Sequence, residues 1–165
     1  MNKESKTTIA NEESMESRLE QILNDALIKA TDTYSVPPQI IWVDNSTIAT
    51  LGNFSASTGK AKAKKTFNVS ALVAASLSNG TVLNYRACLP EGKRRILYVD
   101  TEQSRYHCHN VLARILKLAG LPTDMDNQNL NFIGLREYTP AIRMEVIDYA
   151  LAHNHGYGLV IICLL

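Results

Sequence analysis

The sequence predicts an α/β fold in which a mostly parallel sheet is covered by helices. From residue 95 onward, short apolar segments alternate with segments whose apolar residues recur at helical spacing. The apolar segments 96–99 and 159–162 lack the polar alternation of a half-exposed strand, and such runs are typical of parallel strands buried on both faces. The chain has 165 residues and is 45% hydrophobic, which is enough for one sizeable core.

The region 1–35 is predicted to be a polar, disordered tail followed by an amphipathic helix. Residues before about Glu13 are mainly polar, and the following apolar residues form a single stripe at helical spacing. The stripe consists of Met15, Leu19, Ile22, Leu23, Ala26 and Leu27. We expect it to pack on the domain's own sheet, and the alternative is an arm that docks on a neighbouring subunit. The sequence Val36-Pro37-Pro38 separates this region from the second one, 36–165.

The second region is predicted to begin with a β-hairpin. The segments 39–43 and 47–51 are strand-like and flank Asp44-Asn45-Ser46, which is typical of a turn. A short buried strand is expected over 54–58, followed by a lysine-rich loop. The next segment, 67–77, is apolar nearly all round and predicts a helix enclosed in the core.

The remainder is predicted to alternate between strands and helices. Strands are expected over 95–100, 130–135 and 158–163. One helix is expected over 104–118, and another over 139–154 with Thr139 at its cap and Pro140 at its first position. In sheets of this kind, ligands bind at the carboxyl ends of the strands.

The lysine-rich loop comes close to the G-x-x-x-x-G-K-[ST] pattern that holds nucleotide phosphates. Its residues are Gly59, Lys60, Ala61, Lys62, Ala63, Lys64, Lys65 and Thr66. In such a turn, backbone N–H groups and a helix N-terminus converge on an anion. Lys65 would reach the outer phosphates, and the Thr66 hydroxyl would bind Mg²⁺. The alternatives are a solvated basic loop and a loop that grips the phosphate backbone of DNA.

Lys64 stands where the pattern has its second glycine. Glycine permits a positive φ and a close approach of the backbone to the ligand, whereas lysine is strained in a left-handed conformation because it has a Cβ. We therefore expect a loop of variant shape.

Several segments together resemble the RecA-like ATPase core, in the branch of RepA-like replicative helicases and related ATPases of mobile elements. They are residues 52–55, the loop through Phe67, 96–103 and 158–162. The resemblance covers about residues 50–163. It implies that 36–165 is a partial RecA-like P-loop NTPase core that binds ATP and Mg²⁺, with a homo-oligomer and DNA as expected partners. It also implies that Glu102 polarises the attacking water.

Two acidic residues have a structural alternative, and one expected acid is absent. Asp100 is also suited to capping the next helix with Gln103 as its partner, and Glu102 to complementing the helix dipole. At the position of the Walker B aspartate, which would hold Mg²⁺, the sequence has Cys163, and a thiol is a poor ligand for this cation. Asp100 is then the substitute acid for the metal. We expect a chain truncated at this strand that binds nucleotide better than it hydrolyses it.

Composition limits the function classes further. The net charge of +1 gives no global basicity for nucleic acid, so any DNA site would be local. Three cysteines without C-x-x-C spacing indicate neither a disulfide framework nor a zinc ribbon. The first residues, 1–6, lack the apolar region of a secretory leader, and no apolar run approaches membrane-spanning length, so we expect a cytoplasmic protein without membrane association. The sequence thus predicts an ATP-binding domain of DNA replication or mobilisation, with a nucleotide-binding module without turnover, or a DNA-binding protein, as alternatives.

Overall fold

The computed structural model describes residues 3–59 and 64–163, with side chains from residue 15 onward, in two compact units. The first unit, Met1–Val36, contains helix α1 (Lys3–Ala26), which begins within the segment expected to be disordered. The apolar stripe of α1 is solvent-exposed, with Met15, Leu19, Ile22 and Leu23 between 51% and 66% accessible. Among the helices of the described ranges, none combines the length and apolarity that crossing a membrane requires.

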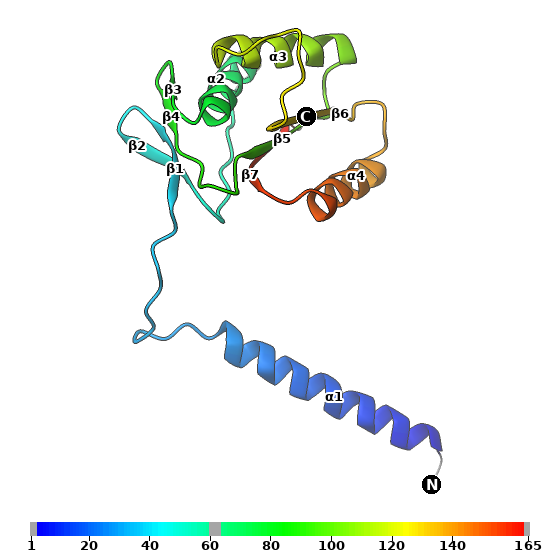
Figure 1. Ribbon diagram of the computed structural model, residues 1–165. Coiled ribbons are helices and arrows are strands. Elements are labelled where there is room, and N and C mark those ends of the chain that lie inside the picture. The colour runs from blue at the N-terminus through cyan, green and yellow to red at the C-terminus, as the bar shows by residue number, and fades with distance from the viewer. Residues whose placement is uncertain (1–2, 60–63, 164–165) are drawn as a thin grey trace. The chain divides into compact units, whose positions relative to one another are not determined.

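The second unit, Pro37–Leu165, contains a four-stranded antiparallel sheet (Figure 1). Its order is β2 (Ser46–Thr50), β1 (Gln39–Val43), β4 (Tyr85–Ala87) and β3 (Thr81–Val82). β1 and β2 form the predicted hairpin, and Asp44 adopts a left-handed φ of 50° in its turn. Ile41 of β1 pairs with Ala87 of β4, and both side chains are buried in the main core. This sheet therefore has one face against the core.

A separate three-stranded sheet is entirely parallel, in the order β6 (Leu130–Gly134), β5 (Arg95–Asp100) and β7 (Tyr157–Cys163). Every residue of β5 after Arg95 is buried, as expected for a central strand covered on both faces. Asp100 pairs with Gly134 on one side and Cys163 on the other. The carboxyl ends of the three strands therefore meet at one edge.

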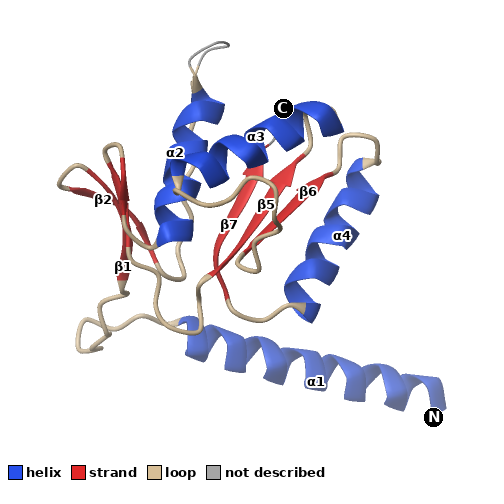
Figure 2. Cartoon of the chain, turned by 45° about the horizontal axis from the view of Figure 1, so that its top comes forward, coloured by secondary structure: helices blue, strands red, loops and turns tan. Residues whose placement is uncertain are grey.

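Helices cover both faces of the parallel sheet (Figure 2). Ile96 and Tyr98 of β5 belong to the cluster formed with α2 (Lys65–Ser78) and α3 (Arg105–Leu118). Leu97 and Val99 pack instead in the cluster that contains residues of α4 (Pro140–His153). The cluster formed with α2 and α3 also contains Ile41 and Ala87 of the antiparallel sheet, so the buried middle of α2, around Ala71 and Ala74, packs in a core shared by both sheets.

The prediction of one mostly parallel sheet forming a RecA-like P-loop core is wrong. The hairpin pairs through β4 into its own antiparallel sheet, which is separate from the parallel one. The segment 54–58 is not a strand: the Phe54 side chain is 96% exposed, and the Ser55 hydroxyl donates to the Ile48 carbonyl at 2.7 Å. This segment has mostly hydroxyl and small side chains, so it offers little apolar surface to bury as a strand. The described residues consequently show no P-loop core.

Candidate functional site

The N-terminus of α2 begins without the usual capping residue. Its N-cap residue, Lys64, is left-handed with φ 56° and ψ 25°, the Lys64 side chain makes no capping hydrogen bond, and the first turn contains no acid. The N–H groups of Phe67 and Asn68 both donate to the Lys64 carbonyl. The earlier N–H groups of an α-helix have no partner within the helix, and together with the positive end of the helix dipole they favour an anion.

α4 shows the ordinary arrangement by contrast. The Thr139 hydroxyl accepts a hydrogen bond from the Ile142 N–H at 3.4 Å, and Pro140 occupies the first helical position, as the sequence predicts. At the N-cap α2 has Lys64 where α4 has this hydroxyl. The Ser104 side chain at the N-cap of α3 makes no capping hydrogen bond either, and the first turns of α2, α3 and α4 all lack an acid, so the left-handed Lys64 followed by Lys65 is what distinguishes α2.

The predicted phosphate loop lies partly within the described residues. Gly59 is exposed, and residues 60–63, which are Lys60, Ala61, Lys62 and Ala63, lie outside the described ranges. Lys64 and Lys65 are exposed, whereas Thr66 is half-buried at the second position of α2. The left-handed Lys64 lies at the position where the sequence pattern calls for glycine.

Asp100 lies at the carboxyl end of β5 and supports the turn that follows. Its side chain is 0% exposed. Its Oδ1 accepts hydrogen bonds from the Glu102 N–H at 2.9 Å and the Gln103 N–H at 2.8 Å, and its Oδ2 accepts one from Gln103 Nε2 at 2.7 Å. The N-cap of α3 is Ser104, so Asp100 holds the turn before the helix rather than capping the helix itself.

Cys163 ends β7 beside Asp100. Thr101 Oγ1 donates to the Cys163 carbonyl at 2.8 Å. Burial raises the pKa of the Cys163 thiol, and the negative charges of Asp100 and Glu102 also raise it. The hydrogen bond with the Tyr98 hydroxyl and the positive charge of Lys65 lower it, but the net shift is upward.

A hollow of about 470 Å³ adjoins the start of α2. Lys64, Thr66 and Phe67 line it from α2 and its cap, and Arg114 lines it from α3. The sequence motif predicts Lys64 and Thr66 as site residues but neither Phe67 nor Arg114. Phe67 was detectable as an aromatic residue directly after Lys65-Thr66, whereas nothing in the sequence distinguishes Arg114 from other surface cations on α3.

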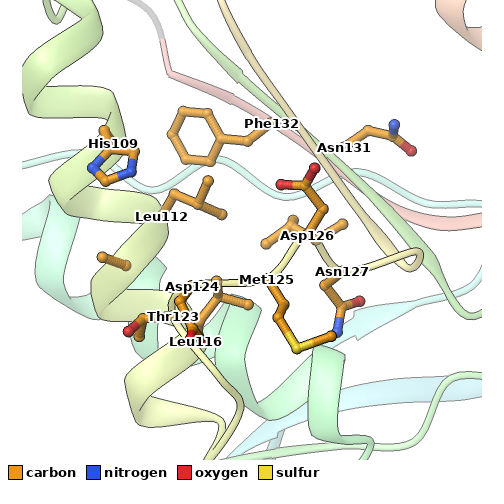
Figure 3. A pocket seen from close by; sticks show the side chains of 12 residues that line it. His109, Leu112, Leu116, Thr123, Asp124, Met125, Asp126, Asn127, Asn131 and Phe132 are labelled. Atoms are coloured by element: carbon orange, nitrogen blue, oxygen red, sulfur yellow. The ribbon is translucent and has the colours of Figure 1, made fainter.

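A second hollow, of about 520 Å³, lies between α3, the 123–127 segment and β6. Figure 3 shows His109 and Leu112 of α3 on one side, and Asp126 and Asn127 of the connecting segment on the other. None of the predicted site residues lines it. Its carboxylates would repel a phosphate, so this hollow does not fit an anionic ligand.

The residues expected to hold Mg²⁺ differ in how well they suit it. Within the described residues, no three His, Cys, Asp or Glu side chains gather as a metal cluster. Thr66 supplies a half-buried hydroxyl at the start of α2. Asp100 is fully buried and already accepts three hydrogen bonds, so its carboxylate is committed to the turn after β5 and does not suit direct contact with a metal. A cation that shares phosphate oxygens, water and Thr66 fits this arrangement.

Comparisons with known proteins give no relative: no protein-family model, no curated protein and no solved structure matches the chain. The resemblance of the sequence motifs to RecA-like ATPases therefore stays a prediction.

Proposed function

We propose that the chain binds a nucleoside triphosphate, ATP, together with Mg²⁺ at the N-terminus of α2. The single observation that supports this proposal is the uncapped first turn, which follows a left-handed Lys64 and contains Lys65 and no acid. Helix N-termini of this kind favour phosphate through their free N–H groups and their dipole. Lys65 would then neutralise the outer phosphates.

The roles of the neighbouring groups follow from their chemistry. The bound Mg²⁺ would neutralise phosphate charge, with the Thr66 hydroxyl as its ligand from the protein. Glu102 lies in the turn held by Asp100, and its carboxylate would orient a water molecule. Cys163 offers no negative charge at neutral pH because its pKa is raised. We therefore propose binding with little or no turnover.

A second candidate uses the same cations. Arg114 lines the hollow beside Lys64, so two cations from different elements border the start of α2. Such a group also fits the phosphodiester backbone of DNA. A DNA-binding role, alone or in a homo-oligomer that acts in replication or mobilisation, is the alternative proposal.

Thermal unfolding with and without ATP and Mg²⁺ tests the proposal. At about a hundred times the dissociation constant, ATP should add about 2.7 kcal/mol to the free energy of unfolding. Lys65→Ala should abolish this gain. Lys93→Ala is the matched control, because Lys93 is exposed and precedes β5, at the end of the strand opposite to Asp100.

Two outcomes would contradict nucleotide binding. One is a melting curve that ATP leaves unchanged, and the other is an equal loss of the gain in both lysine variants. The DNA alternative predicts instead that oligonucleotide binding weakens steeply with salt and that Lys65→Ala reduces the slope by about one.

A further inference from the structure

The antiparallel sheet carries a row of side chains that crosses all four of its strands. Trp42 of β1 pairs with Thr47 of β2 on one side and with Arg86 of β4 on the other. Arg86 pairs in turn with Thr81 of β3. Ala87, which follows Arg86, is buried in the main core. Because successive side chains of a strand point to opposite faces, the row lies on the outer face of the sheet, away from that core.

The Trp42 ring is held in place on this outer face. Its Nε1–H donates to Gln39 Oε1 at 3.3 Å, and the Thr47 hydroxyl donates to the same oxygen at 3.0 Å. The Arg86 guanidinium lies over the ring, with its central carbon 3.8 Å from the ring centroid. This position is favourable because the face of an indole attracts a cation. Trp42 and Arg86 therefore form a preorganised pair on the surface.

The positive charge of this pair is not neutralised within the described part of the chain. Arg86 is exposed, and it is the only charged residue in β1, β2, β3 and β4. Among the described residues, its guanidinium makes the contact with Trp42 but no hydrogen bond and no ion pair. A guanidinium has five N–H donors in a planar fork, which matches phosphate and carboxylate oxygens. The outer face thus complements an anionic partner.

We infer that the outer face of the antiparallel sheet binds single-stranded nucleic acid, at a site that does not depend on the proposed ATP site. The free donors of Arg86 suit a backbone phosphate, and aromatic rings and guanidinium planes are the surfaces on which unpaired bases stack. An acidic peptide would match the charge of Arg86 but would leave the planar surface unused. Duplex bases are already stacked on one another, so the face should favour single strands.

Trp42 is the only tryptophan of the chain, so its fluorescence reports on this face directly. Titration with a single-stranded thymidylate oligonucleotide should quench it to a plateau. Arg86→Ala should weaken the affinity about tenfold, in the lower part of the range for one stacked base. It should also reduce the slope of log affinity against log salt by about 0.7, the value for one lost phosphate contact. Arg86→Lys keeps the charge without the plane, so it should keep the slope and still weaken binding.

Arg94→Ala is the matched control, because Arg94 is an exposed arginine outside the four strands. It removes the same charge and should leave the affinity and the quenching unchanged. Lys65→Ala should leave the quenching unchanged as well, so a failure of ATP binding would not touch this inference.

Four results would overturn the inference. One is an oligonucleotide that leaves Trp42 fluorescence unchanged, and another is an equal loss of affinity in Arg86→Ala and Arg94→Ala. A duplex of the same length that binds as tightly as the single strand would exclude base stacking. Equal quenching by a polyglutamate peptide would assign the face to acidic peptides instead.

Discussion

The Tyr98 hydroxyl and the Cys163 sulfur lie 3.2 Å apart, within hydrogen-bond distance, between β5 and β7. Tyr98 is fully buried, and its ring stacks on Phe132 of β6 with ring centroids 4.3 Å apart. A single tyrosine thus contacts side chains of both neighbouring strands. Cys163, which Tyr98 contacts, stands at the position where the family resemblance predicts a metal-binding aspartate.

Tyr98 should make the chain sensitive to alkaline pH. Burial raises the pKa of its phenol, and the hydrogen bond to Cys163 raises it further. Because the pKa is higher in the folded state, the unfolded chain ionises first, and stability is lost as the pH rises above about 10, the ordinary value for tyrosine. Tyr98→Phe should lower the free energy of unfolding at pH 7 by about 1 kcal/mol. The variant should then lose less stability between pH 9 and 11 than the unchanged chain does.

Urea unfolding at pH 7, 9 and 11 measures this difference. Tyr106→Phe is the control, because Tyr106 is 73% exposed and its loss should leave the pH profile unchanged. Parallel profiles for Tyr98→Phe and the unchanged chain would show that the Tyr98 phenol does not limit alkaline stability.

Lys64→Gly should stabilise the fold. A left-handed conformation costs a residue with a Cβ about 1–2 kcal/mol, and the extra freedom of glycine in the unfolded chain offsets about 0.4–1 kcal/mol of the gain. We expect a net gain of up to about 1 kcal/mol in urea unfolding. Lys65→Gly is the matched control: Lys65 begins the helix proper, so glycine there should destabilise by up to about 1 kcal/mol. Changes of the same sign in both variants would refute strain at Lys64.

Asp100 should be essential for stability independently of any metal. Its carboxylate accepts three hydrogen bonds in a fully buried position, and two of the donors are backbone N–H groups. Asp100→Ala leaves these donors without their partner and should cost about 3 kcal/mol or more in chemical denaturation. Asp124→Ala, at an exposed position, should change stability by less than about 0.5 kcal/mol. A small effect of Asp100→Ala would contradict the stabilising role of these three hydrogen bonds.

The elements from β5 to β7 could be predicted because their signals are local. Apolar runs such as 96–99 are bounded by turn residues, and Thr139-Pro140 marks the start of α4. The β3–β4 hairpin was missed because its strands have two and three residues and its Leu83-Asn84 turn lacks glycine. Which sheet a strand joins depends on partners that are distant in sequence. The residues of the hairpin 39–51 therefore did not predict that it pairs with β4 and not with the parallel strands.

The residues of the candidate site also differ in whether a local sequence signal predicts them. Lys65 and Thr66 follow from a linear motif, and the left-handed Lys64 agrees with the glycine that the motif has at this position. Phe67 and Arg114 border one hollow only because α2 packs beside α3, and sequence separation says nothing about that contact. Side chains contributed by packing between helices are therefore the part of the site that the sequence could not give.

Turnover of ATP by this chain should be very low. Phosphoryl transfer depends on positioning and on neutralising charge, and Mg²⁺ prefers oxygen ligands. The Cys163 side chain has no oxygen, and its thiol carries no negative charge at neutral pH because its pKa is raised. The cation would therefore rely on Thr66, water and phosphate oxygens. Steady-state phosphate release should fall well below about 1 s⁻¹, the lower end of the ordinary range, and Glu102→Gln should not change it. Turnover within that range that Glu102→Gln abolishes would contradict this prediction, and it would make Asp100 the acid that holds the metal in place of Cys163.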